Sequence, residues 1–379
     1  MTESTKVKRA RYKIPENKEI KNINFSKTPR YQRIIYWIYF YKYLTAYNIA
    51  SLLFLDEKNG DLSFSGKTRR SELKEVNFTG IQKNISHLWQ HGYLQKWSVR
   101  NPMYYQNGSV ADVYTLGKES IPILADMLGK FPDELNIPQF ARKDKVHKGQ
   151  PIGLYNYLSH NVEISNLLIS LKLFSYFSYG TYKVIYSAYD KQIKEKISYY
   201  DSQGKFIRTN LIPDGLIIIE NEITGDRSNF FIEIDRQTES LPVWLEKMNK
   251  YSNFYRDGKS LEFFQKFYEN NPELTNNGQV AEKWTKNFRV ICATTSLKRI
   301  ENMVEKTIQN FRGGKGTNMF LYTLLDNFNV SVLKTTYSKS GNKYSYNDVN
   351  FDKSRILSHS VFYAGHEKYN KQPFKIFDV

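Results

Sequence analysis

Two short apolar runs that adjoin acidic residues constrain the fold of this chain most. Residues 216–219 are Leu-Ile-Ile-Ile and follow Pro213-Asp214-Gly215, while a second run from Asn229 ends in Glu233-Ile234-Asp235. Short apolar runs bounded by turn residues are typical of buried strands. Because side chains alternate along a strand, Glu233 and Asp235 should share one face. If the runs are neighbours in a sheet, Asp214 joins them and forms a cluster of three carboxylates.

Three carboxylates at one end of a sheet repel each other unless a cation neutralises them. Oxygen ligands suit Mg²⁺ or Mn²⁺. Arg236 is the only fixed cation that the sequence places near these acids. The pattern therefore predicts a divalent metal site at Asp214, Glu233 and Asp235.

This spacing resembles the core of PD-(D/E)xK nucleases, in which an Asp and a Glu on adjacent strands hold the metal that activates water. The resemblance implies that Asp214 and Glu233 are the metal ligands. Asp235 stands where the family has lysine, although some restriction endonucleases of this superfamily also carry an acid there. A helix expected over residues 241–256 supplies Lys247 and Lys250, and either could replace the missing lysine. The alternative is that Asp214 ends a turn and Asp235 caps that helix, since short motifs produce false positives.

The charge of the chain predicts a polyanionic partner. The 379 residues carry a net charge of +17. Residues 1–100 contain 19 Lys and Arg against 8 Asp and Glu, and therefore hold +11 of that total. Basic domains of this kind bind nucleic acid. We expect the N-terminal part to carry most of this contact.

Cysteine usage and hydropathy indicate a cytoplasmic protein. The single cysteine, Cys292, lies in the apolar run 290–293 and should be a core residue. No disulfide can form within the chain, which fits a reducing compartment. No apolar run approaches the length of a transmembrane helix, and residues 1–28 form a basic arm without the apolar stretch of a signal peptide. That arm is either a solvated tail or a DNA contact.

The pattern of residues 29–128 predicts a winged helix-turn-helix domain. Helices are expected at residues 30–43, at 46–54 with Thr45 as N-cap, and from 77 or 79 to about 91. A strand at 93–97, a tip at 100–109 and a return strand at 111–116 would form the wing. Three helices followed by a β-hairpin is the order of this fold, in which the third helix reads DNA.

The polar face of the third expected helix carries the candidate DNA contacts. Ile81, Ile85 and Leu88 are spaced as a buried stripe. The remaining face has donors and acceptors for base edges and phosphates: Gln82, Lys83, Asn84, Ser86, His87 and Gln90. Arg100 would sit in the wing. The alternative is a winged helix used for protein interaction, with these side chains solvated.

We expect residues 129–153 to form a linker. We expect residues 154–379 to form a PD-(D/E)xK nuclease-like domain with a C-terminal extension. A helix over 155–175 places His160 and Glu163 on one face. Strands are expected at 182–186, 193–200 and 288–294, besides the two acidic strands, with a helix at 298–311. This order of elements is similar to the nuclease fold. The first helix of that fold often supplies an accessory acid, which makes Glu163 a candidate.

In combination, these features resemble the replication-relaxation family of plasmid and mobile-element proteins. The resemblance is carried by residues 30–116, His160, Pro213-Asp214-Gly215, the stretch 233–239 and Lys247 with Tyr251. It implies a bacterial protein that binds double-stranded DNA at a plasmid or transfer origin. It also implies replication or conjugation proteins as partners, and no membrane.

Two functions fit the sequence. The first is a Mg²⁺- or Mn²⁺-dependent DNA endonuclease or nickase, with a site built from Asp214, Glu233, Asp235, Glu163 and Lys247. The second is a non-catalytic replication or transfer factor that binds an origin and uses its nuclease-like domain as a scaffold. The absent lysine favours the second, and the carboxylates favour the first.

Overall fold

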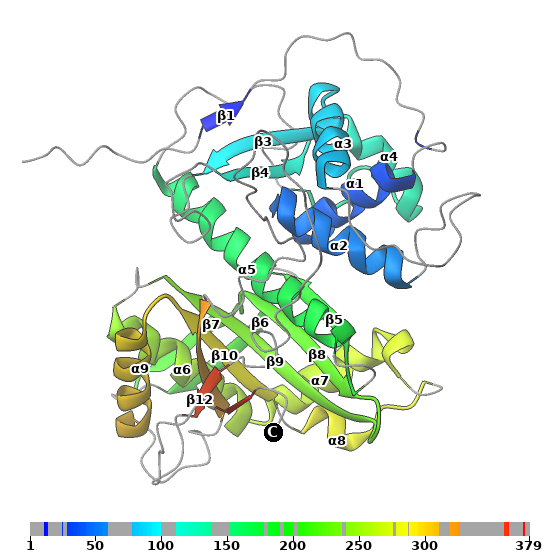
Figure 1. Cartoon of the computed structure of the whole chain (residues 1–379). Coiled ribbons are helices and arrows are strands. Elements are labelled where there is room, and N and C mark those ends of the chain that lie inside the picture. The colour runs from blue at the N-terminus through cyan, green and yellow to red at the C-terminus, as the bar shows by residue number, and fades with distance from the viewer. Residues whose placement is uncertain are drawn as a thin grey trace, which may run out of the picture. The chain divides into compact units, whose positions relative to one another are not determined.

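The computed structural model has two compact units, and each is a mixture of helices and strands (Figure 1). The described residues are 11–13, 25, 29–59, 78–99, 111–137, 152–177, 181–189, 193–200, 204–236, 240–275, 278–286, 288–310, 319–325, 360–363 and 374–375. The first unit holds the described residues up to Ile169, and the second those from Ser170 on. Helix α5 (Ile152–Phe177) contributes to both. None of the helices in these ranges combines the length and apolar character needed to cross a membrane.

The first unit contains the three helices and the β-hairpin that the sequence predicts. Its elements are α1 (Pro29–Tyr41), β2 (Leu44–Thr45), α2 (Ala46–Asn59), α3 (Phe78–Gln90), β3 (Leu94–Val99), β4 (Ala111–Leu116) and α4 (Ser120–Leu128). The short strand β1 (Arg11–Lys13) completes an antiparallel sheet in the order β1-β3-β4-β2. Helix α4 was not predicted, and neither were strands β1 and β2, which are so short that their pairing rather than a local pattern specifies them.

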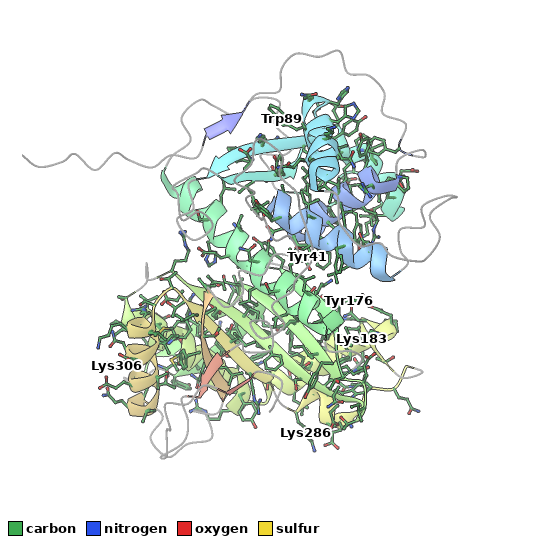
Figure 2. All side chains as sticks on the ribbon, in the orientation of Figure 1. Tyr41, Trp89, Tyr176, Lys183, Lys286 and Lys306 are labelled. Carbon is green, nitrogen blue, oxygen red and sulfur yellow. The ribbon has the colours of Figure 1, made fainter. Side chains whose placement is uncertain are left out.

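Local chemistry sets the junction between α1 and α2. Lys42 ends α1 in the left-handed region, with a φ of 66°. Thr45 then caps α2 as predicted, because its Oγ1 accepts the backbone N–H of Asn48 at 3.2 Å. The backbone N–H of Thr45 in turn donates to Asn48 Oδ1 at 2.9 Å, which is the reciprocal arrangement of a capping box. Tyr41, labelled in Figure 2, is fully buried beside this junction.

The second unit is built on a seven-stranded sheet in the order β13-β12-β11-β10-β9-β8-β5. Its strands are β5 (Tyr182–Tyr189), β8 (Gly215–Asn221), β9 (Asp226–Asp235), β10 (Phe288–Thr294), β11 (Phe320–Leu324), β12 (Ser360–Tyr363) and β13 (Phe374–Lys375). Strands β5, β8 and β9 form an antiparallel meander, whereas β9, β10 and β11 run parallel. The acidic strands are therefore neighbours, as predicted.

Helices and a separate hairpin complete this unit. They are β6 (Glu195–Tyr200), β7 (Phe206–Leu211), α6 (Leu241–Arg256), α7 (Lys259–Glu269), the short 3-10 helix η4 (Pro272–Leu274), α8 (Glu282–Thr285) and α9 (Leu297–Asn310). The sequence predicted β6, α6 and α9 but not β7 or α7. Figure 2 shows Lys286 and Lys306 on the outside of this unit, just after α8 and on α9.

One face of the sheet packs against a core of large apolar side chains. Phe231 of β9 lies in this core with Trp244, Met248 and Tyr251 of α6. Cys292 of β10 is buried in the same core, as predicted from its apolar run. Alternation along β9 places Glu233 and Asp235 on the same face as Phe231, so the two acids enter the core side of the sheet.

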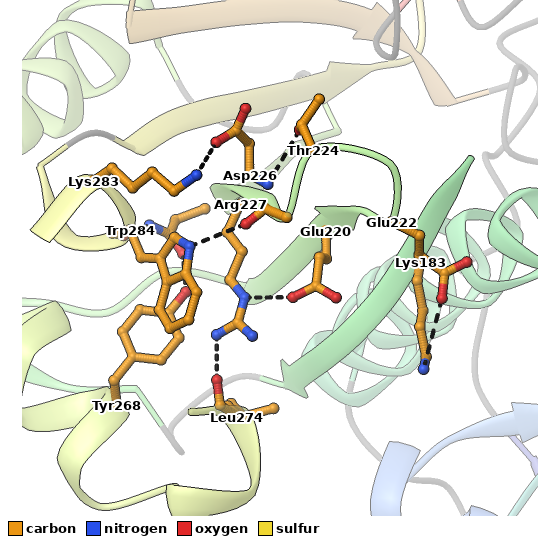
Figure 3. Close-up of polar contacts among 12 residues, drawn as sticks. Lys183, Glu220, Glu222, Thr224, Asp226, Arg227, Tyr268, Leu274, Lys283 and Trp284 are labelled. Carbon is orange, nitrogen blue, oxygen red and sulfur yellow. Dashed lines mark hydrogen bonds and ion pairs between the residues drawn. The ribbon is translucent and has the colours of Figure 1, made fainter. Parts of the chain in front are cut away.

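A cation–aromatic cluster fastens the turn of the β8–β9 hairpin (Figure 3). The Arg227 guanidinium lies 3.6 Å from the ring centroid of Trp284 and donates to Glu220 Oε2 at 2.7 Å and to the Leu274 carbonyl. Trp284 Nε1 donates to the carbonyl of Gly225 at 3.2 Å. These contacts join the turn to α8 and η4, at the opposite end of the strands from the acids.

Candidate functional site

The register of β8 and β9 places Asp214 beside Glu233. Gly215 pairs with Ile232, so Asp214 lies opposite Glu233 at the end of the ladder. The backbone N–H of Asp214 donates to the Ile232 carbonyl at 3.0 Å, and Asp214 Oδ2 accepts the N–H of Ile234 at 2.7 Å. These two bonds hold the Asp214 carboxylate against β9, where it remains partly exposed.

Glu233 is enclosed by two side chains of α6. Its Oε1 accepts the Tyr251 hydroxyl at 2.6 Å, and its Oε2 lies 3.1 Å from Lys247 Nζ. Lys247 and Tyr251 are one helical turn apart and therefore share a face of α6. Of the two lysines that could replace the missing one, Lys247 contacts Glu233, whereas Lys250 pairs with Glu246 at 3.2 Å.

The surroundings of Glu233 favour its protonated form more than water does. The side chain is only 3% exposed, and this burial raises its pKa from the usual 4.5 to about 7. The Lys247 ammonium opposes the rise in pKa, and the Asp214 charge adds to it. Burial and the Glu233 charge also raise the pKa of Tyr251 well above its usual range, so this phenol stays a hydrogen-bond donor.

Asp235 forms a separate ion pair. It is 2% exposed, and its Oδ2 accepts Arg299 Nε at 2.6 Å. Arg299 belongs to α9, which follows β10, and Thr294 at the end of β10 pairs with Asp235 in the parallel ladder. Topology therefore brings Arg299 to the acid across 64 residues.

Because Asp235 pairs with Arg299, the expectation that three carboxylates form one cluster is corrected. In the described part of the chain, no three His, Cys, Asp or Glu side chains are placed to hold one metal ion. Asp214 and Glu233 lie together, but Asp235 is neutralised by Arg299. The expectation that Arg236 is the sole nearby cation is wrong, since Lys247 and Arg299 both contact the acids. Asp235 does not cap α6 either, because Ser240 occupies the N-cap position.

Asp214 and Glu233 suit a hard divalent ion. Mg²⁺ is commonly bound through one or two carboxylates, with waters and substrate phosphates completing its shell. Two facing carboxylates, of which Asp214 is partly exposed, match that donor set. The residues present therefore fit Mg²⁺ or Mn²⁺ as a two-carboxylate site.

Glu163 and His160 lie on α5, in the portion that belongs to the first unit. Glu163 is buried and His160 is partly buried. Their suggested roles beside the carboxylates stay predictions. Residues 237–239 lie outside the described residues.

Helix α3 presents its polar side chains as the sequence predicts. Ile81, Ile85 and Leu88 are buried, while Gln82 and Lys83 are exposed. A hollow of about 400 Å³ opens beside the helix, lined by Tyr31, Lys83, Asn84, Ser86, His87 and Gln90. Arg100, the wing candidate, lies outside the described residues.

Tyr31 is a lining residue that the sequence did not indicate. It lies on α1, and its hydroxyl is hydrogen-bonded to His87 Nδ1 at 2.9 Å. The His87 ring also contacts that of His91, with centroids 4.3 Å apart. His87 is thus fixed by two neighbours, which limits how far it can turn toward a ligand.

Arg299 was likewise missed, whereas Tyr251 carried a usable signal. The spacing of Lys247 and Tyr251 on a predicted helix already puts both on one face. No local pattern marks Arg299, because its contact depends on the parallel pairing of β9 with β10.

Comparison with known proteins identifies the family of the chain. The model of the replication-relaxation family matches residues 35–266. This match covers more than half of the chain and includes Lys83, Asp214, Glu233 and Lys247, while Arg299 lies beyond it. Searches of curated proteins and of solved structures gave no significant match. The chain therefore belongs to the replication-relaxation family.

Proposed function

We propose that this protein binds a plasmid or transfer origin through its first unit and nicks DNA with the carboxylate site of its second. Membership of the replication-relaxation family indicates a role in replication or relaxation. The observation that carries the cleavage proposal is the contact of Lys247 with Glu233, opposite Asp214. An Asp, a Glu and a Lys at one strand end provide the residue types that a PD-(D/E)xK nuclease uses.

The order of elements supports this assignment of folds. From residue 152 on, the order α5-β5-β8-β9-α6-β10 runs through three antiparallel strands and then a parallel one, as in the nuclease core. The two-stranded insertion β6–β7 is an addition to it. In the first unit, the order α1-β2-α2-α3-β3-β4 supports a winged helix.

Each residue of the carboxylate site has a separate part in the proposed reaction. Asp214 and Glu233 would hold Mg²⁺ or Mn²⁺, which when bound would lower the pKa of a water and stabilise phosphoryl charge. Tyr251 orients Glu233 through its hydrogen bond to Oε1. Lys247 places a positive charge where it can stabilise charge that develops on the phosphate.

Asp235 would act less directly. The Asp235–Arg299 pair joins the end of β9 to α9 and so positions the neighbouring Glu233. Glu163 belongs to the first unit and is given no part in the proposed reaction. Neither residue would be a metal ligand.

Duplex binding would use the exposed face of α3. Gln82 and Lys83 are exposed, and the hollow beside them is bordered by further donors and acceptors on Asn84, Ser86 and Gln90. Phosphate contacts supply most of the affinity of such domains, and base-edge contacts supply the specificity. The excess of positive charge in residues 1–100 supports this assignment.

Incubation of the full-length protein with supercoiled plasmid that carries its origin tests the cleavage proposal. We expect open-circular product with Mg²⁺ or Mn²⁺ and none with a chelator. The Asp214→Ala and Glu233→Ala variants should leave the plasmid intact while they still bind duplex DNA. Intact supercoiled and single-stranded DNA with either metal would reject the enzyme.

A non-catalytic origin-binding factor is the second candidate. It is favoured by the burial of Glu233, whose two carboxylate oxygens already contact Tyr251 and Lys247. Thermal unfolding separates the candidates, because an ion that binds only the folded state raises Tm. The cleavage proposal predicts that Mn²⁺ raises the Tm of the wild type and not that of Asp214→Asn. Equal responses would favour the scaffold.

A further inference from the structure

The β6–β7 hairpin has one apolar face and one polar face. Cross-strand partners point to the same side, and sides alternate along the strands. Ile197, Tyr199 and Leu211 share the first face and are buried in the core of the second unit. The hairpin is therefore anchored by that apolar face, and its polar face is directed toward solvent.

The outward face carries three cross-strand pairs, of which two include a cation and the third is aromatic. In order toward the tip, they are Lys196 with Asn210, Ser198 with Arg208, and Tyr200 with Phe206. Tyr200 is 68% exposed and Phe206 46% exposed, and their ring centroids are 5.2 Å apart. Exposed aromatic rings beside cations are a feature of surfaces that bind unpaired nucleic-acid bases.

One cation lies beside these rings, and it borders a hollow together with two others. The Arg208 guanidinium lies 5.3 Å from the Phe206 ring centroid. A hollow of about 400 Å³ is lined by Lys196, Ile197, Ser198, Arg208, Thr209, Asn210 and Lys259. Lys259 comes from the first residue of α7. Among the described residues of β6 and β7, Glu195 is the one acid, and it belongs by alternation to the anchored face, near Lys259 and Lys266. The described residues of the outward face therefore carry only positive charge, on Lys196 and Arg208.

We propose that the outward face of the β6–β7 hairpin binds a DNA strand whose bases are unpaired. Lys196, Arg208 and Lys259 would contact its phosphates, and bases would stack on Tyr200 and Phe206. Proteins that bind single strands combine a basic groove with aromatic side chains in this way. The Lys196–Asn210 and Tyr200–Phe206 pairs are four residues apart, which is about 13 Å at the rise of a β-strand. One DNA strand can therefore reach both the cations and the rings.

The hairpin leads directly to the carboxylate pair. Strand β7 ends at Leu211, and Asp214 follows three residues later, immediately before the first residue of β8, Gly215. A DNA strand that runs from the rings at the tip past Lys196 toward the base of the hairpin would thus approach Asp214. The inference rests on the proposed action on DNA, but binding does not depend on cleavage. The substrate of the Asp214 and Glu233 site would then be a DNA strand that is locally melted.

Fluorescence anisotropy with the full-length protein tests the inference. The probes are a single-stranded oligonucleotide, its abasic counterpart, its duplex and an RNA of the same sequence, all with a chelator to prevent cleavage. Stacking on an aromatic side chain contributes about 1–3 kcal/mol per base, which corresponds to roughly 5- to 150-fold in Kd. We expect Tyr200→Ala/Phe206→Ala to weaken single-strand binding by such a factor and to leave duplex binding within about twofold.

Matched controls separate stacking from charge and from damage to the fold. Ile223→Ala removes another exposed apolar side chain, and Lys283→Ala/Lys286→Ala removes two exposed cations near the opposite end of β8–β9. These controls should bind the single strand as the wild type does. Lys196→Ala/Arg208→Ala should instead reduce the salt dependence, by about 0.7 in log–log slope per lost phosphate contact. Unchanged Tm values would show that the hairpin is still folded.

The outcomes decide the proposal. Wild type should bind the abasic strand about as weakly as Tyr200→Ala/Phe206→Ala binds the normal strand. Equal wild-type affinity for normal and abasic strands, or no loss in the aromatic variant, would overturn it, as would tighter binding of RNA. Failure of plasmid nicking with intact single-strand binding would reject only the nuclease.

Discussion

The ammonium nitrogen of Lys247 lies 3.1 Å from Oε2 of Glu233, although the two residues belong to different elements, α6 and β9. In the nuclease pattern that the site resembles, the lysine follows the glutamate on the same strand. Here that strand position holds Asp235, and the positive charge enters from the facing helix. An Asp, a Glu and a Lys thus lie together as in that pattern, but the lysine belongs to α6 and not to the strand.

Lys247→Met should reduce nicking strongly. The substitution keeps most of the aliphatic stem and removes the charge that would stabilise the phosphate in the transition state. Loss of one such group costs about 10²–10³ in kcat. Lys250→Met is the matched control, because Lys250 lies on the same helix and pairs with Glu246. Single-turnover nicking of both variants checks this, and equal rates would remove Lys247 from the mechanism.

Asp235→Lys should not create a more typical nuclease site. The new ammonium would face Arg299, which now pairs with the buried Asp235 carboxylate. Removal of one partner from a buried ion pair costs about 3–5 kcal/mol, and a second cation adds repulsion. Urea unfolding should show this loss of stability, and Asp235→Lys/Arg299→Glu should recover part of it. No recovery in the double variant would contradict the pairing.

Lys83 and Gln82 should differ in their effects on duplex binding. Both side chains are exposed on α3, and neither belongs to the buried stripe. Lys83→Ala should weaken binding to all sequences and lower the log–log salt slope by about 1, as loss of a phosphate contact does. Gln82→Ala should instead alter sequence preference, by about 1–3 kcal/mol at one base pair. Titrations with origin and scrambled duplexes at several salt concentrations distinguish the two.

Lys42 should make stability rise with pH in the alkaline range. Burial lowers its pKa from 10.5 to about 8 in the folded protein. Between these values the unfolded chain holds a proton that the folded protein has released, so the free energy of unfolding increases with pH there. Lys42→Met lacks this contribution. Its stability relative to wild type should therefore be highest below about pH 8 and should decline toward about pH 10.

Urea unfolding at several pH values measures this difference. Lys286→Met is a suitable control, since Lys286 is exposed and its ion-pair partner, Glu282, is an exposed residue one helical turn away. A constant difference between Lys42→Met and wild type across the range would contradict the lowered pKa.

Local spacing was enough to predict the elements that carry the candidate residues. The stripe of Ile81, Ile85 and Leu88 identified the buried side of α3, and Thr45 identified the start of α2. The alternation in β9 put Glu233 and Asp235 on one face. Each of these inferences uses residues within a few positions of one another, where helix and strand periodicity applies directly.

Contacts that depend on long-range pairing were not predictable in this way. Arg299 reaches Asp235 only because β10 runs parallel to β9. Strand β7 was missed because Phe206 is an apolar residue on the otherwise polar, exposed face of the strand. It therefore obscures the alternation that the apolar positions Ile207 and Leu211 would show. An exposed aromatic residue thus weakened the signal for the strand that carries it.

The β8–β9 hairpin is fastened at both ends. Arg227 holds its turn against Trp284, and Asp214 and Asp235 bind partners at its open end. Strand pairs usually fray from an unsupported end, and their amide protons then exchange with solvent in a graded order. Here neither end is unsupported, so the amides of both strands should exchange together, in a single cooperative opening. Removal of either fastening should turn that uniform protection into a gradient along the strands.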